Sequence, residues 1–278
     1  MQSPKISIAP SPPGPQFAEL QWRGQPLQLE YQWVGDAAST EPVIVFLHEG
    51  LGSLAMWKDF PARLCAEPGF KGLVFSRYGY GRSTPKPPNE RWPVSFMHEQ
   101  AFNVLPALFD ALGVHRPWLF GHSDGGSIAL LHAARFPVAG LVVVAPHILV
   151  EDLSIASIEK AREAYARTDL RQRLARYHAD PYSAFRGWND IWLDPSFRDW
   201  SIEAELARIK APVLAVQGED DEYGTLEQIR GIARALPKTR LLVMPECGHS
   251  AHRDQPEELI RHTTEFILQS STPPSRPF

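Results

Sequence analysis

Near the middle of the chain stands Trp118-Leu119-Phe120-Gly121-His122-Ser123-Asp124-Gly125-Gly126. An apolar run leads into Gly-x-Ser-x-Gly, and the pattern of residues 127–135 predicts an amphipathic helix directly after it. In such a strand-to-helix turn the serine is strained and its oxygen is exposed, and glycines flank it because side chains there would collide with neighbouring elements. The stretch therefore predicts a nucleophile elbow with Ser123 at its tip. Since so short a match also arises by chance, the partners of the serine must support it.

Short apolar runs on both sides of this stretch predict buried strands. Those that alternate with helical patterns are residues 43–47, 73–76, 118–120 and 141–145. This alternation is typical of a parallel sheet with right-handed crossovers. Two alternating segments near the N-terminus predict a hairpin that adds an antiparallel edge, with strands at 17–22 and 27–33 and a turn at 23–26. Helices are expected at 55–66 and 95–112, kinked near Pro61 and Pro106.

The residue pattern changes after Pro146, from alternating strands and helices to helix alone. Residues 151–200 carry no strand signal and are rich in helix formers and aromatic residues, so residues 147–200 are interpreted as a helical cap over the carboxyl ends of the strands. Strand patterns return at 212–217 and 240–244, with helices at 225–236 and 256–268. The expected organisation is a flexible arm (1–16), an α/β core (17–146 and 201–269), the cap, and a flexible tail (270–278). The cap aromatics are equally consistent with a small core of the cap itself.

Composition narrows the class of protein. The 278 residues are 44% hydrophobic and 22% charged, which is ordinary for a globular enzyme. A net charge of -4 favours neither nucleic acid nor an anionic membrane surface as a partner. The two cysteines lack metal-ligand or redox spacing, and residues 1–16 lack the apolar stretch of a signal peptide. We therefore expect a cytoplasmic protein with no metal, no cofactor and no membrane span; its oligomeric state is not predicted.

A serine nucleophile needs a base, and the base needs an orienting acid. After the strand at 213–217 comes Gly218-Glu219-Asp220-Asp221-Glu222, where Asp221 is favoured as the acid over Asp220. After the last strand comes Gly248-His249, and His249 is favoured as the base over His48, His122 and His252. The order serine, acid, histidine is the one an elbow fold requires.

The oxyanion of the reaction needs backbone donors. The N–H of Asp124, at the start of the elbow helix, should supply one hydrogen bond. The second is expected from the loop His48-Glu49-Gly50-Leu51-Gly52, where Gly50 is the first choice and Leu51 the second, because glycine permits the closest backbone approach. We expect Leu51, Trp57, Trp188 and Trp192 to line an apolar substrate pocket under the cap.

Taken together, the elbow, the His48–Gly52 loop, the loop Arg77-Tyr78-Gly79-Tyr80-Gly81-Arg82-Ser83 and the two downstream motifs resemble the serine-dependent α/β-hydrolase family. The resemblance covers about residues 43–268. It implies an eight-stranded, mostly parallel sheet with helices on both faces, a cap after the sixth strand, and a Ser-Asp-His catalytic triad. The chain departs from the family at Glu49, where glycine is usual, so a carboxylate adjoins the oxyanion loop.

Three functions follow from these expectations. The first is hydrolysis of a carboxylic ester, thioester or lactone through an acyl-enzyme, on a small substrate with an apolar or aromatic part. The second is carbon–carbon bond hydrolysis of a ring-fission product, or amide hydrolysis, by the same triad. Arg82 or the cap arginines Arg162, Arg171 and Arg186 could then bind a substrate carboxylate, although a solvated helix face is the simpler interpretation of those arginines. The third is a non-catalytic protein that binds a small ligand.

Overall fold

The computed structural model describes residues 14–40, 42–66 and 68–271. The expected arm at 1–16 lies largely outside the described residues, and Gln16 already begins the first strand. The expected tail at 270–278 was placed too early, because Ser270 and Ser271 are still helical; the rest of it lies outside the described residues.

One sheet of eight strands organises the chain, in the order β1-β2-β4-β3-β5-β6-β7-β8. The strands are β1 (Gln16–Trp22), β2 (Gln25–Gly35), β3 (Ile44–Leu47), β4 (Lys71–Phe75), β5 (Trp118–His122), β6 (Gly140–Val144), β7 (Val213–Gly218) and β8 (Arg240–Met244). Strand β2 pairs antiparallel with β1 and with β4, and the pairs from β4 to β8 are all parallel. The predicted hairpin edge and parallel sheet are confirmed. The buried strands β3, β5, β6 and β7 read as continuous apolar runs because both of their faces are covered.

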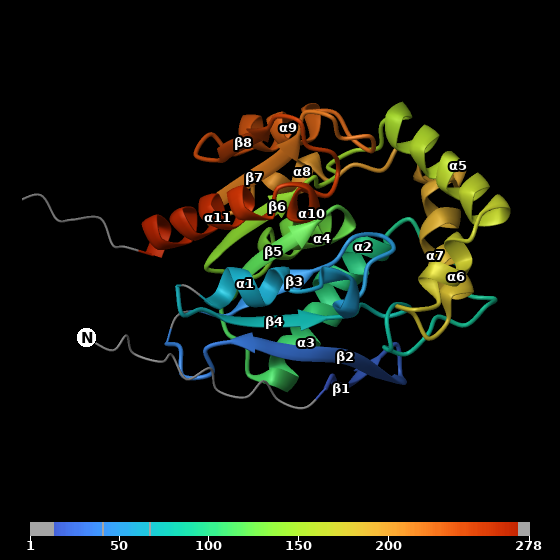
Figure 1. Ribbon diagram of the computed structural model, residues 1–278, viewed down its shortest axis with the longest axis horizontal. Helices are drawn as coiled ribbons and strands as arrows, with labels where there is room; N and C mark the ends of the chain where they lie inside the picture. The colour runs from blue at the N-terminus through green and yellow to red at the C-terminus, as the bar shows by residue number, and fades with distance from the viewer. Residues whose placement is uncertain (1–13, 41, 67, 272–278) are drawn as a thin grey trace, which may run out of the picture.

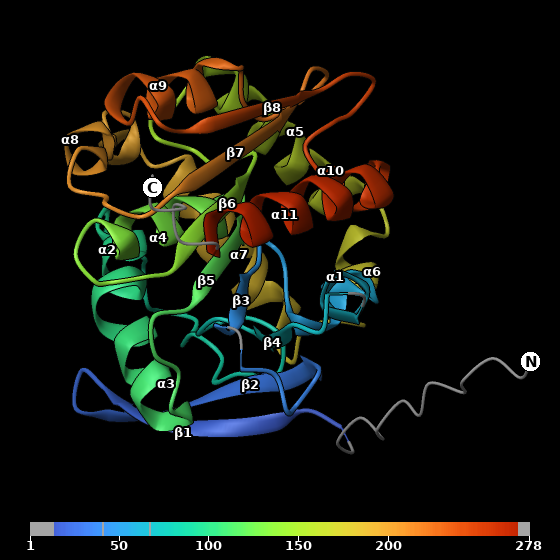
Figure 2. The same ribbon diagram turned by 90° about the vertical axis from the view of Figure 1, so that its left-hand side faces the viewer.

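Helices cover both faces of the sheet (Figures 1 and 2). The face with α1 (Phe60–Ala66) and α11 (Pro256–Ser271) carries one apolar cluster, built on Phe46, Phe120 and Leu214. The other face packs α3 (Leu105–Leu112), α4 (Asp124–Ala133) and α9 (Glu227–Ala235) over a larger cluster. Short helices complete the fold: α2 (Phe96–Glu99), α8 (Glu203–Leu206) and α10 (Ala251–Asp254). No described helix is long and apolar enough to cross a bilayer.

The two expected proline kinks take different forms. The first helix is broken at Lys58, whose φ of 56° separates a 3-10 turn, η1 (Leu54–Trp57), from α1, while Pro61 sits in the first turn of α1, where proline is tolerated. The prediction of a break near Pro61 was therefore displaced by a few residues. Ahead of Pro106 the helix widens into a π-turn, η2 (Gln100–Val104). This widening accommodates the missing N–H of proline without ending the helix.

The segment between β6 and β7 is helical. It contains α5 (Asp152–Arg167), α6 (Leu170–Leu174), α7 (Pro181–Trp192) and a 3-10 turn, η3 (Pro195–Phe197). An isolated antiparallel bridge between Leu149 and Ser201 closes its base. Figure 1 shows α5, α6 and α7 beyond the carboxyl ends of the parallel strands. The helices of this cap thus stand over the edge of the sheet where β5, β7 and β8 end.

Candidate active site

Ser123 sits at the junction of β5 and α4, with φ 53° and ψ -121°. This left-handed backbone is rare for a residue with a side chain and is tolerated only where the surroundings enforce it. Close packing of neighbouring backbone around the turn supplies this constraint, and the flanking glycines permit it. A Cβ on Gly121 would lie 2.4 Å from the carbonyl oxygen of Gly125, and a Cβ on Gly125 would lie 2.1 Å from that of Leu47. The predicted elbow geometry is therefore present, and Ser123 occupies its tip.

Asp221 follows β7 in a turn that satisfies both of its carboxylate oxygens. Its Oδ1 accepts from the N–H of Tyr223 at 2.8 Å and lies 2.8 Å from His249 Nδ1, while Oδ2 accepts from Gln217 Nε2 at 2.8 Å. Burial alone would raise the pKa of Asp221, but the hydrogen bond and charge of His249 outweigh it and the pKa is lowered. Asp220, the alternative acid, is exposed. Asp221 is thus held as an anion against the histidine.

His249 lies in the loop after β8 and is the residue that Asp221 orients. Because its Nδ1–H donates to Asp221, its Nε2 is left as an acceptor. Its ring packs 4.8 Å from the ring of Tyr223 and 5.0 Å from that of His122, the neighbour of Ser123. No hydrogen bond joins His249 to Ser123 Oγ in the described part of the chain, and such catalytic contacts often tighten only around substrate. The structure brings acid, base and serine to one edge of the sheet.

A second imidazole, which the sequence reasoning missed, contacts the serine. His147 Nε2 lies 3.4 Å from Ser123 Oγ, and the His147 and His249 rings are 5.9 Å apart. His147 is buried, and burial followed by the nearby His249 lowers its pKa to about 3. The signal available in the sequence was its place, directly after the buried strand at 141–145 and a proline, where side chains reach the carboxyl edge of a parallel sheet.

The two expected oxyanion donors lie on facing loops. Among the described residues, the backbone N–H groups of Asp124 and Gly50 form no hydrogen bond, which leaves them free to donate to a substrate oxygen. Gly50 has a further reason to be glycine, because a Cβ there would lie 2.2 Å from the indole of Trp188. Leu51, the second choice, has a carbonyl oxygen 3.0 Å from Nε2 of His178, which comes from the cap.

Glu49, the departure from the family pattern, has its carboxylate directed at cationic and imidazole groups. Its Oε2 lies 3.6 Å from His122 Nδ1, and its Oε1 accepts from Arg253 at 3.2 Å. Burial by itself raises the pKa of Glu49, but the opposite effect of His122, His252 and Arg253 is larger. The pKa is therefore well below its usual value. His122 Nε2 in turn lies 2.8 Å from the carbonyl oxygen of His249. Glu49 therefore links the oxyanion loop, the elbow and the histidine loop.

The expected substrate-binding residues divide into two groups. Trp188 and Trp192 come from α7 of the cap: Trp188 packs on Gly50, and Trp192 donates from Nε1 to Asp124 Oδ1 at 3.1 Å. Trp57 is only 2% exposed, and its ring packs with Phe46, Phe60 and Phe120 in the core on the α1 face. The sequence predicts all three tryptophans in the pocket. Trp57 instead has core aromatic residues as neighbours, so we leave it out of the proposed binding surface.

Asp124 is a buried acid, and its backbone N–H is one of the expected oxyanion donors. Burial raises its pKa to about 6, although the nearby Arg77 guanidinium opposes this shift. Arg77 Nη2 lies 3.9 Å from Asp124 Oδ2 and donates to the carbonyl oxygen of Glu49 at 2.8 Å. The backbone of the oxyanion loop is thereby tied to the start of the elbow helix.

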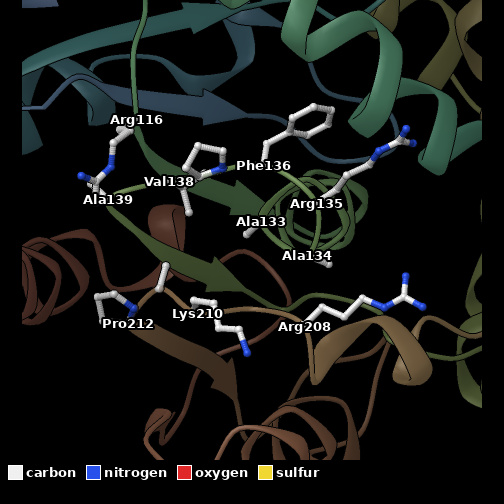
Figure 3. A pocket seen from close by; sticks show the side chains of 12 residues that line it. Arg116, Ala133, Ala134, Arg135, Phe136, Val138, Ala139, Arg208, Lys210 and Pro212 are labelled. Carbon is white, nitrogen blue, oxygen red and sulfur yellow. The ribbon is translucent and has the colours of Figure 1, made fainter.

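A groove of about 420 Å³ lies far from this chemistry (Figure 3). It is lined by residues that precede β5, β6 and β7, among them Arg116, Arg135, Arg208 and Lys210. The amino ends of those strands lie at the opposite edge of the sheet from Ser123. The groove is therefore separate from the candidate active site.

Comparison with known proteins agrees with this geometry. A sequence model of the alpha/beta hydrolase family matches residues 44–262. The chain is 24% identical over 259 residues to 2-hydroxy-6-oxo-6-phenylhexa-2,4-dienoate hydrolase of Comamonas testosteroni, a match that covers 81% of this chain and 87% of that protein. It is 27% identical over 251 residues to the serine hydrolase BPHL of Homo sapiens, covering 87% and 83% respectively.

Among solved structures, the enol-lactonase from Burkholderia xenovorans matches with a TM-score of 0.71 and 22% identity, covering 91% of this chain and all (100%) of that one. At that identity the likeness shows the fold alone. The family match, by contrast, spans most of the chain, including the elbow and the acid and histidine loops. The protein is thus a hydrolase that belongs to the alpha/beta hydrolase family.

Proposed function

We propose that this protein is a serine hydrolase that cleaves a carboxylic ester, thioester or lactone through an acyl-enzyme at Ser123. The observation that carries the proposal is the 2.8 Å contact between His249 Nδ1 and a buried Asp221, beside a serine held at φ 53° on the elbow. A weakly acidic hydroxyl becomes a useful nucleophile only next to a base oriented in this way.

The reaction follows from these positions. Ser123 Oγ attacks the carbonyl carbon while its proton passes to His249 Nε2, and Asp221 stabilises the imidazolium that forms. The negative charge on the carbonyl oxygen is met by the N–H groups of Asp124 and Gly50. His249 then protonates the leaving group. In the second half of the reaction His249 takes a proton from water, which attacks the acyl-enzyme carbonyl carbon. The bond to Ser123 Oγ then breaks, the proton returns to that oxygen and the carboxylic acid product leaves.

The cap supplies the surface that would select the substrate. Trp188 and Trp192 border the elbow and the oxyanion loop, so a small molecule with an apolar or aromatic part fits best.

The test compares wild-type protein with Ser123→Ala on p-nitrophenyl acetate and butyrate, and by labelling with a fluorophosphonate probe. We expect the variant to lose at least a thousandfold in kcat and all labelling, since removing a triad member leaves only binding and the oxyanion donors. Ser95→Ala, at an exposed serine, is the matched control and should behave as wild type. Unchanged turnover in Ser123→Ala would end the proposal.

Carbon–carbon bond hydrolysis is the second candidate, because a relative at 24% identity is named as a dienoate hydrolase. The arginines considered for binding a substrate carboxylate give it little support. Arg82, Arg162 and Arg171 are exposed, and Arg186 pairs with Asp190 at 2.9 Å. Assays of the purified enzyme separate the candidates. The substrates are 2-hydroxy-6-oxo-dienoates, amides and esters, and the class with the highest kcat/KM identifies the kind of bond that the enzyme cleaves. A purely binding role predicts no fluorophosphonate adduct at all.

A further inference from the structure

His147 is a candidate for a part in the chemistry, because it touches the reacting oxygen and the triad leaves it without a role. We propose that His147 is a catalytic residue whose Nε2–H donates a hydrogen bond to Ser123 Oγ and stabilises negative charge on that oxygen. The inference rests on the proposed function, because it assigns a second partner to the same nucleophile. Its basis is the 3.4 Å contact between His147 Nε2 and Ser123 Oγ, together with the contacts that fix the orientation of the His147 ring.

The backbone of His147 is fixed by the elbow helix. The chain leaves β6 through Ala145, whose φ of 47° turns it sharply. Ser127, in the first turn of α4, accepts from the N–H of His147 at 3.1 Å and donates to its carbonyl oxygen at 2.6 Å. Because both hydrogen bonds come from the helix that Ser123 begins, serine and histidine are held in one frame.

The ring of His147 is fixed from the cap. Trp192 packs edge-on against it at 4.8 Å, and the indole N–H of Trp192 is itself anchored on Asp124. A side chain constrained by packing on one side and by its own backbone on the other keeps a single orientation at little entropic cost during the reaction.

The tautomer follows from counting protons. A serine hydroxyl has one proton to donate and two lone pairs. In the proposed reaction that proton goes to His249, so any hydrogen bond between Ser123 and His147 must run from Nε2–H to Oγ. The other ring nitrogen agrees: His147 Nδ1 is buried without a partner, and a buried acceptor without a partner is tolerated better than a buried orphan N–H.

The low basicity of His147 argues against a role as general base. Burial, with the imidazoles of His249 and His122 nearby and only Asp221 opposing, lowers the pKa of His147 to about 3. Its imidazole therefore stays neutral at neutral pH and keeps one proton throughout. In acylation the Oγ–H proton passes to His249 as the Oγ–carbon bond forms. In deacylation that bond breaks and the proton returns, while the His147 N–H steadies the charge on Oγ in both steps.

The experiment compares His147→Gln, which keeps an N–H donor, with His147→Leu, which keeps the size and removes the donor. For p-nitrophenyl butyrate we expect His147→Leu to lower kcat about 10²-fold, in the range for one donor to a developing oxyanion, with KM nearly unchanged. His147→Gln should recover most of that loss. The rate of fluorophosphonate labelling should follow kcat, and the acid limb of the pH–rate profile should not move in either variant. His132→Leu, at another buried histidine that contacts Phe109 rather than Ser123, is the control.

A second measurement needs no variant: NMR of wild-type protein with ¹⁵N-labelled histidine reports the tautomer and charge of His147 directly. We expect a neutral His147 with the proton on Nε2; a proton on Nδ1 overturns the inference. Equal kcat in His147→Leu and wild type also overturns it, as does a shifted acid limb, which would make His147 the base. If wild-type protein carries no fluorophosphonate adduct, the proposed function fails and the role of His147 fails with it. Normal wild-type labelling beside unaffected His147 variants removes only the present inference.

Discussion

The proposed active site has two halves that are built in different ways. The core half consists of Ser123, Asp221 and His249, which follow the ends of β5, β7 and β8. The cap half consists of Trp188 and Trp192 on α7, with His178 just before that helix. The two halves meet where Trp188 lies on Gly50 and Trp192 donates to Asp124.

The halves also differ in what holds them. Core residues are positioned by hydrogen bonds from neighbouring loops, such as the donation from Gln217 to Asp221. The cap half is positioned by contacts with loops of the core. Trp188 lies on Gly50. His178 accepts from the N–H of Gly81 at 3.0 Å, and its other ring nitrogen lies 3.0 Å from the carbonyl oxygen of Leu51. Damage to the core half should therefore lower kcat, whereas damage to the cap should alter KM and selectivity. Three kinetic predictions test that division, and a fourth concerns stability.

The largest effect is expected for Asp221→Asn. The asparagine cannot stabilise an imidazolium and favours the wrong tautomer of His249, so kcat should fall about 10⁴-fold with little change in KM. Asp220→Asn is the matched control, because its side chain is exposed beside the same histidine loop. Steady-state kinetics on p-nitrophenyl butyrate decide between the two acids, and the roles assigned to Asp221 and Asp220 would have to be exchanged if Asp220→Asn were the inactive variant.

Next in size is Gly50→Ala, where the two halves touch. A Cβ there would meet the Trp188 indole at 2.2 Å, so either the oxyanion loop or the cap must move, and we expect kcat/KM to fall about 10²-fold, as for a lost oxyanion donor. Trp188→Ala alone should raise KM only a few-fold.

The double variant Gly50→Ala/Trp188→Ala makes a thermodynamic cycle of this contact. If the clash with the indole causes the loss, the double variant is more active than Gly50→Ala alone. Additive losses would instead show that Gly50 is needed for a reason unrelated to the cap.

A smaller effect is expected for Glu49→Gln, which weakens the link from the oxyanion loop through His122 to the carbonyl oxygen of His249. We expect kcat to fall about tenfold at nearly constant KM, since the base is held less firmly. Glu258→Gln, an exposed pair with Arg261 on α11, should leave the kinetics untouched. A rise in KM without a fall in kcat would place Glu49 in substrate binding instead.

The smallest effect concerns stability alone. Burial lowers the pKa of His132 to about 4, so it stays neutral in the folded protein while the unfolded chain is protonated below about pH 6.5. The stability it contributes is present above pH 6.5 and is lost as the pH falls through 4. Urea unfolding at pH 7.5 and 4.5 should show a drop in the free energy of unfolding that is smaller by roughly 2 kcal/mol in His132→Leu than in wild type. Equal drops would mean that His132 is not desolvated.

Much of the fold was predictable from local patterns. The apolar runs at 43–47 and 118–120 and the alternation at 17–22 became β3, β5 and β1, because burial on both faces or on one leaves a direct trace in the residue pattern. The places where irregular helix meets proline were harder to predict. The position of the break at Lys58 and the form of the helix before Pro106, a π-turn, are not recorded in the hydrophobic periodicity.

The candidate site divides in the same way. Ser123, Asp221 and His249 could be proposed from sequence because each follows a strand in the order the fold requires, and the structure places Asp221 and His249 in contact at 2.8 Å. Trp57, His147 and Glu49 could not be placed in that way. The sequence predicts Trp57 in the pocket, whereas it packs in the core. The place of His147 after β6 does not by itself indicate that its ring reaches Ser123.

The sequence by itself determined the sheet, the elbow and the chain order of the proposed serine, acid and histidine, since apolar runs, strand ends and the Gly-x-Ser-x-Gly pattern are local features of the sequence. The tertiary structure alone decided which buried histidine meets the serine, where the Glu49 carboxylate is directed, and which tryptophans the cap brings to the site. Those choices join residues 24 to 127 positions apart, as in the His147–Ser123 and His122–His249 contacts. They are settled by packing between elements, because no local pattern specifies which side chains will share a desolvated space.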